Sequence, residues 1–210
     1  MDTIIRQRIN ESEALGREIT TEWLQKKYAD TERDIRITPT PVECSVDLKV
    51  NLLDKELQHR QRVNIEVKLR KKNERQIQQY PHGELKVDKF QRMKEATDDG
   101  AGLFYCVLLD NTDTHKQTLY MWDMNNLNWE NVGRYNWETK YCQSDPDSGT
   151  YVTPIYQIPF SQAVCSADVT DIFKEYGNHF QTKEVKKEAP EGTQKAANFN
   201  KVLQCIPQNA

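Results

Sequence analysis

The strict alternation of apolar and polar side chains over residues 62–70 constrains the fold more than any other feature of the sequence. The apolar positions of this segment are Val63, Ile65, Val67 and Leu69. Successive side chains of a β-strand point to opposite faces of a sheet, so the pattern predicts a strand with one buried face. The other face then carries Asn64, Glu66 and Lys68 side by side.

A second alternating segment precedes the first one. Residues 44–52 have apolar side chains at alternate positions, namely Val46, Leu48 and Val50. Asp47 and Lys49 lie between them and face the other way. The polar stretch at 53–60 predicts a turn, so the two strands would form an antiparallel hairpin. In that hairpin the side chains of Asp47 and Glu66 can approach each other.

A long amphipathic helix is predicted over residues 3–28, ahead of these strands. Its stripe recurs at three- and four-residue spacing and consists of Ile5, Ile9, Ser12, Gly16, Ile19 and Trp23. Gly16 on this stripe would let the helix approach its neighbour closely. A short β-branched strand at residues 35–38 follows the helix.

Three further segments complete the expected core. Residues 87–97 have helical spacing and end at Asp98, Asp99 and Gly100. The continuous apolar run at 102–110 is typical of a central strand buried on both faces, and residues 118–123 predict its antiparallel neighbour. The expected fold class is therefore mixed α/β, with an αβββαβ core and a mixed central sheet flanked by helices.

The rest of the chain gives weaker signals. Residues 71–85 are polar and contain Pro81 and Gly83, which predicts a loop. Residues 151–160 predict one more strand, and a short helix is expected to begin between Ser166 and Thr170.

The length of 210 residues suits a single domain. We expect that domain at residues 1–180, with its core at about 5–123 and an extension at 124–180, and a flexible polar tail at 181–210. No stretch approaches the roughly 18 apolar residues of a membrane span. The N-terminus also lacks a secretory pattern, which favours a soluble, cytoplasmic protein.

The five cysteines and four histidines do not form a zinc pattern. There is no C-x-x-C pair, the cysteine count is odd, and the histidines are scattered. These features argue against both a disulfide framework and a structural zinc site.

The charge of the chain is unevenly distributed. The net charge is −3 and the pI is about 5.9, which is too acidic for a simple nucleic-acid binder. Residues 49–94, however, contain 13 Lys or Arg against six Asp or Glu. Such a local excess suits contact with phosphate backbones, although a solvated charged surface explains it equally well.

The hairpin brings together the groups that metal-dependent phosphodiester hydrolysis requires. Mg²⁺ binds one or two carboxylates and keeps its remaining positions for water and substrate phosphate. Asp47 and Glu66 supply carboxylates, and the Val67 carbonyl between Glu66 and Lys68 is a further oxygen ligand. A neighbouring lysine can orient or deprotonate water and offset charge in the transition state, which is the role expected for Lys68.

The element order and the D…(E)-x-K pattern, in CSVDLKV and NIEVKLR, resemble the PD-(D/E)xK nuclease superfamily with its restriction-endonuclease-like fold. The likeness spans about residues 5–123. It implies Asp47 and Glu66 as metal ligands, Lys68 as a catalytic residue, Mg²⁺ as the cofactor with Mn²⁺ as a substitute, and nucleic acid, in particular DNA, as the substrate. No proline directly precedes Asp47, but that proline is often absent in the superfamily.

The same resemblance implies two further contributions. Members often carry an acidic residue on the first helix, for which LGREITTEWL offers Glu18 as the best match, with Glu22 and Glu11 as rivals. Many also have a polar residue on the helix after the motif, where Lys89 or Gln91 can serve. Members that cut both DNA strands commonly act as dimers, so a homodimer is one of the assemblies that the resemblance allows.

A non-enzymatic interpretation stands beside the nuclease hypothesis. Glu66 and Lys68 can form an ordinary surface ion pair, and the chain can be a nucleic-acid-binding or assembly protein on the same fold. The aromatic side chains of Trp122, Trp129, Trp137 and Tyr135 can stack on bases, but packing in the core or in loops is the favoured interpretation.

Overall fold

The structure of the chain is a computed structural model. It describes residues 3–31, 33–41, 44–54, 59–97, 100–140 and 150–176. The expected tail at 181–210 lies outside these residues, as do the side chains of Ile5 and Ile9 on the predicted helix stripe. None of the described helices is long and apolar enough to cross a membrane.

The main sheet is mixed, as the sequence predicted. Its six strands stand in the order β1 (Arg33–Pro39), β2 (Leu48–Asp54), β3 (His59–Lys72), β5 (Gly102–Asn111), β6 (Gln117–Asp123) and β9 (Cys165–Asp168). Strands β3 and β5 run parallel, and all other neighbours in this sheet run antiparallel. The predicted hairpin of β2 and β3, the central strand β5 and its antiparallel neighbour β6 are thereby confirmed, but β2 begins at Leu48 and not at residue 44, so Asp47 precedes the strand.

A second, smaller sheet was not foreseen as a unit. It consists of β4 (His82–Lys86), β8 (Thr150–Pro159) and β7 (Gly133–Lys140), all antiparallel, with β8 in the middle. The strand expected at 151–160 is therefore confirmed as β8. Two short 3₁₀ helices, Trp129–Asn131 and Phe160–Gln162, flank these strands.

The loop predicted at residues 71–85 is wrong in part. The segment contains α2 (Glu74–Gln79) and β4. Asn73 caps α2 by accepting from the Gln76 N–H at 2.8 Å, and the Gln76 side chain accepts from the Asn73 N–H at 3.0 Å. This reciprocal capping box lets a short polar helix form without an apolar stripe, so hydrophobic periodicity could not detect it.

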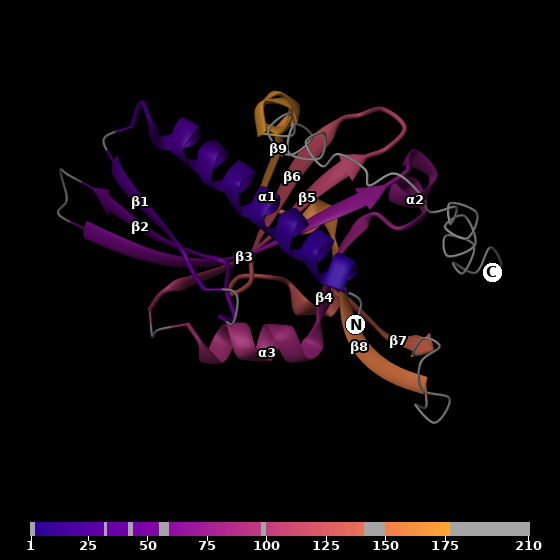
Figure 1. The fold of residues 1–210 in the computed structure, drawn as a ribbon. Coiled ribbons are helices and arrows are strands. Elements are labelled where there is room, and N and C mark those ends of the chain that lie inside the picture. The colour runs from indigo at the N-terminus through magenta and orange to yellow at the C-terminus, as the bar shows by residue number, and fades with distance from the viewer. Residues whose placement is uncertain are drawn as a thin grey trace. The chain divides into compact units, whose positions relative to one another are not determined.

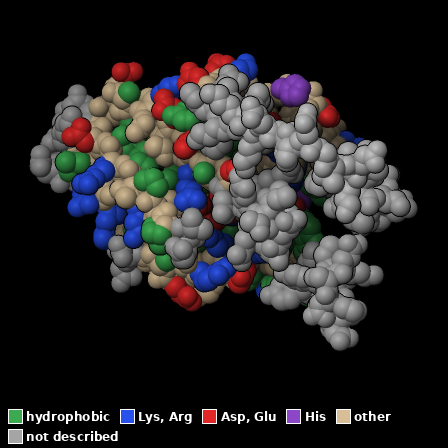
Figure 2. Space-filling view, viewed as in Figure 1, with side chains coloured by type: hydrophobic (Ala, Val, Ile, Leu, Met, Phe, Trp, Pro, Cys, Tyr) green, Lys and Arg blue, Asp and Glu red, His purple; other side chains and the backbone are tan. Residues whose placement is uncertain are grey.

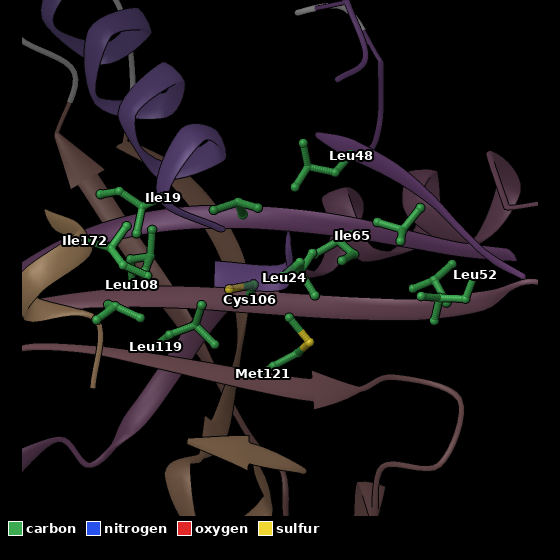
Figure 3. Close-up of a cluster of buried hydrophobic side chains, with 14 residues drawn as sticks. Ile19, Leu24, Leu48, Leu52, Ile65, Cys106, Leu108, Leu119, Met121 and Ile172 are labelled. Atoms are coloured by element: carbon green, nitrogen blue, oxygen red, sulfur yellow. The ribbon is translucent and has the colours of Figure 1, made fainter. Parts of the chain in front are cut away.

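The two faces of the main sheet are covered by different elements (Figure 1). Helix α1 (Thr3–Tyr28) and the helical residues 170–176 pack on one face, where Ile19 and Leu24 of α1 meet the buried residues of the strands (Figure 3). Helix α3 (Val87–Glu95) and the small sheet pack on the other, around Met93 and Trp122. Strand β5 is buried on both faces, as its continuous apolar sequence predicted.

Gly16 fixes how closely α1 approaches the sheet. A Cβ atom at this position would lie 3.3 Å from Cγ1 of Val67 and 3.7 Å from Cδ1 of Leu108. The close approach predicted from the sequence is therefore confirmed. It sets α1 directly against β3, the strand that carries Glu66 and Lys68.

Replacing Gly16 by valine is expected to lower the free energy of unfolding by about 1–3 kcal/mol, because the added methyl groups would push α1 away from Val67. Urea denaturation measures this change. Gln25→Val, at an exposed position on the same helix, is the matched control for helix propensity and is expected to change stability by less than about 0.7 kcal/mol. Equal losses in the two variants would show that close packing at Gly16 is not the cause.

Candidate functional site

The site lies where β3 continues beyond its partner β2. The last pair of their register is Leu48 with Ile65, whereas β3 runs on to Lys72. Within the described residues, β3 from Glu66 onward has a strand partner only on its β5 side. Asp47 stands at the point where the β2 pairing stops.

Asp47 substitutes for the missing strand at this open edge. Its backbone N–H donates to the Ile65 carbonyl at 2.9 Å, and its side-chain Oδ2 accepts from the Val67 N–H at 2.8 Å. Because the N–H and C=O of a strand residue point to the same side, the Val67 carbonyl also faces this edge. The sequence predicted that the side chain of Asp47 approaches that of Glu66. In the structure the Asp47 carboxylate accepts a hydrogen bond from the backbone of the next residue, Val67.

The loop that leads into β2 is tied to the sheet. The Thr40 N–H donates to the Asp47 carbonyl at 3.0 Å, and the Thr40 hydroxyl donates to the carbonyl of Val46. Thr40 and Val46 are both buried. These bonds hold the backbone of Asp47 in one position beside β3.

Glu66 is a fully buried carboxylate, with 0% of its surface exposed. Its Oε1 lies 2.9 Å from the Lys68 ammonium and 3.0 Å from that of Lys89 on α3. Its Oε2 has no hydrogen-bond donor within the described part of the chain. The pKa of Glu66 is raised to about 7, chiefly by burial; Asp47 contributes to the rise, whereas Lys68 and Lys89 oppose it.

Lys68 contacts two carboxylates. Its ammonium lies 2.9 Å from Glu66 and 3.3 Å from Glu13 of α1. Burial lowers the pKa of Lys68, but Glu66, together with Asp47 and Glu13, outweighs that effect and holds the pKa above its ordinary value. Lys68 is therefore a cation at neutral pH in this environment.

Helix α1 contributes the third cation, Arg17. Its Nε lies 3.7 Å from Oδ1 of Asp47, and its guanidinium also donates to the carbonyls of Glu13 and Thr40. The cluster around β3 thus combines three carboxylates and three cations, namely Glu13, Asp47, Glu66, Arg17, Lys68 and Lys89. Their formal charges balance.

The first-helix carboxylate that reaches this cluster is Glu13, which the sequence did not single out. Glu18 and Glu11 are exposed, and Glu22 accepts from the Tyr176 hydroxyl at 3.3 Å and pairs with a lysine of its own helix. The structure therefore does not bring Glu18, the predicted fourth ligand, to the cluster in any described contact.

Helix geometry explains the difference. Residues 3.6 apart complete one turn, so Glu13 and Arg17 lie on one side of α1 while Glu18 lies about 140° away from Glu13. The buried positions Gly16 and Thr20 show which side faces the sheet. That stripe was readable in the sequence, and aligning the carboxylates with it would have favoured Glu13.

Of the two residues considered on the following helix, Lys89 reaches the cluster and Gln91 does not. Lys89 pairs with Glu66, whereas Gln91 is exposed and donates to Glu95 at 3.0 Å on its own helix. The two positions are two residues apart on a helix, so their side chains point about 160° apart.

The donors at this edge fit a hard divalent cation. Asp47 and Glu66 are carboxylates, Val67 adds a carbonyl, and Oε2 of Glu66 is buried without a donor. The described residues contain no group of three or more His, Cys, Asp and Glu side chains suited to a metal. A site with two carboxylates is nevertheless what Mg²⁺ accepts, because Mg²⁺ keeps several waters or phosphate oxygens.

The aromatic residues mostly serve packing. Trp122 is 0% exposed and donates from its ring N–H to the Pro159 carbonyl at 2.9 Å. Trp129 packs against Phe90 with ring centroids 4.8 Å apart. Trp137 is 46% exposed and lies on β7 of the small sheet.

In comparisons with family models, with curated proteins and with solved structures, nothing matches this chain. Any assignment of function therefore depends on the geometry of the cluster and on the likeness of motif and element order.

Proposed function

We propose that this protein is a divalent-metal-dependent nuclease of the PD-(D/E)xK superfamily that hydrolyses phosphodiester bonds in DNA. The element order α1-β1-β2-β3, followed by α3 and β5, supports a restriction-endonuclease-like αβββαβ core, into which α2 and β4 are inserted. Asp47, Glu66 and Lys68 are the active-site residues.

The observation that carries the proposal is the burial of Glu66. Placing an ionised carboxylate in the interior is costly, and replacing such an ion pair by apolar side chains often stabilises a protein. A fully buried carboxylate with a raised pKa, a lysine at 2.9 Å and an unbonded oxygen is therefore more typical of a functional site than of a structural pair.

Each residue of the cluster has a distinct role in this proposal. Asp47, Glu66 and the Val67 carbonyl would hold Mg²⁺ or Mn²⁺, which when bound polarises a phosphate oxygen and acidifies a bound water. Lys68 orients the attacking water and offsets the negative charge that develops on the phosphate. Its raised pKa favours this cationic role over that of a general base. Glu13 and Lys89 position Lys68 and Glu66.

A cleavage assay with supercoiled plasmid DNA tests the proposal. We expect nicking or linearisation in Mg²⁺ or Mn²⁺ and none in EDTA. Titration calorimetry with Mn²⁺ is expected to show binding to the wild type and at least tenfold weaker binding to Asp47→Asn, because one of two charged ligands is lost. Absence of cleavage of DNA by the wild type would overturn the nuclease assignment.

The charge balance of the cluster favours one alternative. Three cations already neutralise three carboxylates without a metal, which suits a non-catalytic nucleic-acid-binding or assembly protein with a structural ion network. In that case Mn²⁺ would produce no heat of binding and no rise in the melting temperature, whereas a ligand that binds only the folded state must raise it.

A further inference from the structure

A row of cations crosses the outer strands of the main sheet on the face that carries Glu66. The register pairs Arg36 of β1 with Asn51 of β2, and Asn51 with Arg62 of β3. Cross-strand partners share a face of the sheet, as do positions two apart along one strand. Arg36 and Arg62 therefore lie on the same face as Glu66.

Two more cations join this row on either side. Lys49 of β2 pairs with Asn64, which lies between Arg62 and Glu66 on this face of β3. Arg60 is the next position of β3 on the same face beyond Arg62, farther from Glu66. The Arg60 guanidinium donates two hydrogen bonds to Oδ1 of Asn51, at 2.7 and 3.1 Å, so the Arg60 side chain extends from β3 over β2. We call Arg36, Lys49, Arg60 and Arg62 the basic face.

The basic face is open to solvent, whereas the sheet surface beside it is covered. Helix α3 ends over Asn64, whose amide donates to the Thr97 hydroxyl at 3.2 Å. Beyond that contact all four cations of the basic face are exposed. Lys and Arg side chains gather at this end of the molecule, beside β2, β3 and α3 (Figure 2).

Acidic side chains on this surface are few. Among the described residues of β1, β2 and β3, the register assigns to this face the exposed Asp34 at its outer end and the fully buried Glu66 at its inner end. A chain whose net charge is −3 thus concentrates four exposed cations next to the proposed active site.

We propose that the basic face binds the phosphate backbone of DNA on one side of the bond that is cleaved. The inference rests on the proposed function, because the bound backbone is that of the substrate. At about 3.3 Å per strand residue, Arg62 and Arg60 lie roughly 13 and 20 Å from Glu66 along β3. Phosphates of one DNA strand advance about 3.4 Å along the helix axis, so the contacts fall roughly four to six nucleotides from the cleaved bond.

The recognition is independent of sequence. The basic face consists of lysine and arginine side chains that project from three strands of the sheet, and side chains of this kind contact phosphates irrespective of the base sequence. An acidic protein surface would also be attracted to these charges. DNA is favoured because the basic face shares its side of the sheet with Glu66 and Lys68.

Fluorescence anisotropy with a labelled 30-base-pair duplex in EDTA tests binding without cleavage. The test variant is Arg36→Glu/Lys49→Glu, since both side chains are exposed and lie on different strands. Arg60→Glu/Arg62→Glu is the second variant. The matched control is Lys71→Glu/Arg75→Glu, which makes the same charge change at exposed positions near the opposite end of β3 (Figure 1).

We expect each test variant to bind the duplex at least tenfold more weakly at 100 mM salt and to lower the salt dependence of log K by about two, one for each lost phosphate contact. The control is expected to stay within about threefold of the wild type. Melting temperatures close to that of the wild type establish that the variants fold.

Three results would overturn the inference: no duplex binding by the wild type, unchanged binding by both test variants, or equal loss in the control. An acidic polypeptide that binds while the duplex does not would point to a protein partner instead.

The binding assay and the cleavage assay together distinguish this inference from the proposed nuclease function. If the basic face binds DNA that is never cut, only the nuclease assignment fails; if DNA is cut equally well by the test variants, only this inference fails.

Discussion

Replacing Lys68 by methionine is expected to slow metal-dependent DNA cleavage about a thousandfold. The ammonium lies 2.9 Å from Glu66 and is protonated at neutral pH because the surrounding carboxylates raise its pKa. Methionine fills a similar volume without the charge, so water orientation and charge stabilisation are both lost. Removing one such group typically costs 10²- to 10³-fold or more in rate.

The control for Lys68→Met is Lys71→Met, on the same strand but exposed and on the opposite face. It is expected to cleave at a rate within about threefold of the wild type. Manganese calorimetry on Lys68→Met adds a second readout, because the metal ligands remain and binding is expected to persist. Cleavage by Lys68→Met within tenfold of the wild-type rate would exclude a catalytic role for this lysine.

Lys68→Met also removes one partner of a buried carboxylate, so its stability must be measured beside its activity. Breaking a buried pair in this way can cost about 3–5 kcal/mol, although Lys89 still contacts Glu66 at 3.0 Å. Assays are therefore run well below the melting temperature of the variant. A loss of rate in a fully folded sample is then a loss of chemistry.

The second large effect is a pH-dependent difference in the free energy of unfolding between the wild type and Glu66→Gln. In the folded chain, burial and then Asp47 raise the pKa of Glu66 from 4.5 to about 7, against the opposing effect of the two lysines. Below pH 4.5 the carboxyl group is protonated in both folded and unfolded chains. Between pH 4.5 and 7 the folded chain keeps a proton that the unfolded chain releases, so wild-type stability falls as pH rises.

The size of this effect follows from the shift. Each pKa unit corresponds to 1.36 kcal/mol, so the wild type is expected to lose about 3 kcal/mol relative to Glu66→Gln between pH 4.5 and 7.5. Urea denaturation in EDTA at several pH values measures the gap. Glu18→Gln, at an exposed position, is the control and is expected to show no such trend. A gap that is constant across this range would show that Glu66 titrates as an ordinary carboxyl group.

Much of the fold was accessible from local pattern alone. Strict alternation predicted the strand β3, the continuous apolar run predicted β5 as a strand buried on both faces, and the three- and four-residue spacing predicted the helix α1; all three elements are present. Alternation also predicted a single buried face for β3, but residues 63–67 are buried on both faces because α3 covers the polar side. The small sheet was harder, because β4 is a short polar strand whose partner β8 is distant in sequence, and β7, the other partner of β8, is also largely polar. Pairing between such strands depends on contacts that a local window of sequence does not contain.

The sequence by itself determined that Glu66 and Lys68 share one face of a strand, since a period of two leaves no other arrangement. It also determined that Asp47 approaches that strand from a hairpin. Only the tertiary structure decided that Glu66 is fully buried, that Asp47 bonds to the Val67 N–H, and that Glu13 rather than Glu18 reaches Lys68. The physical reason is that these contacts join α1 to the sheet across the open edge of β3. Packing at Gly16 sets the rotation of α1 about its axis, and this rotation decides which carboxylate of the helix reaches Lys68.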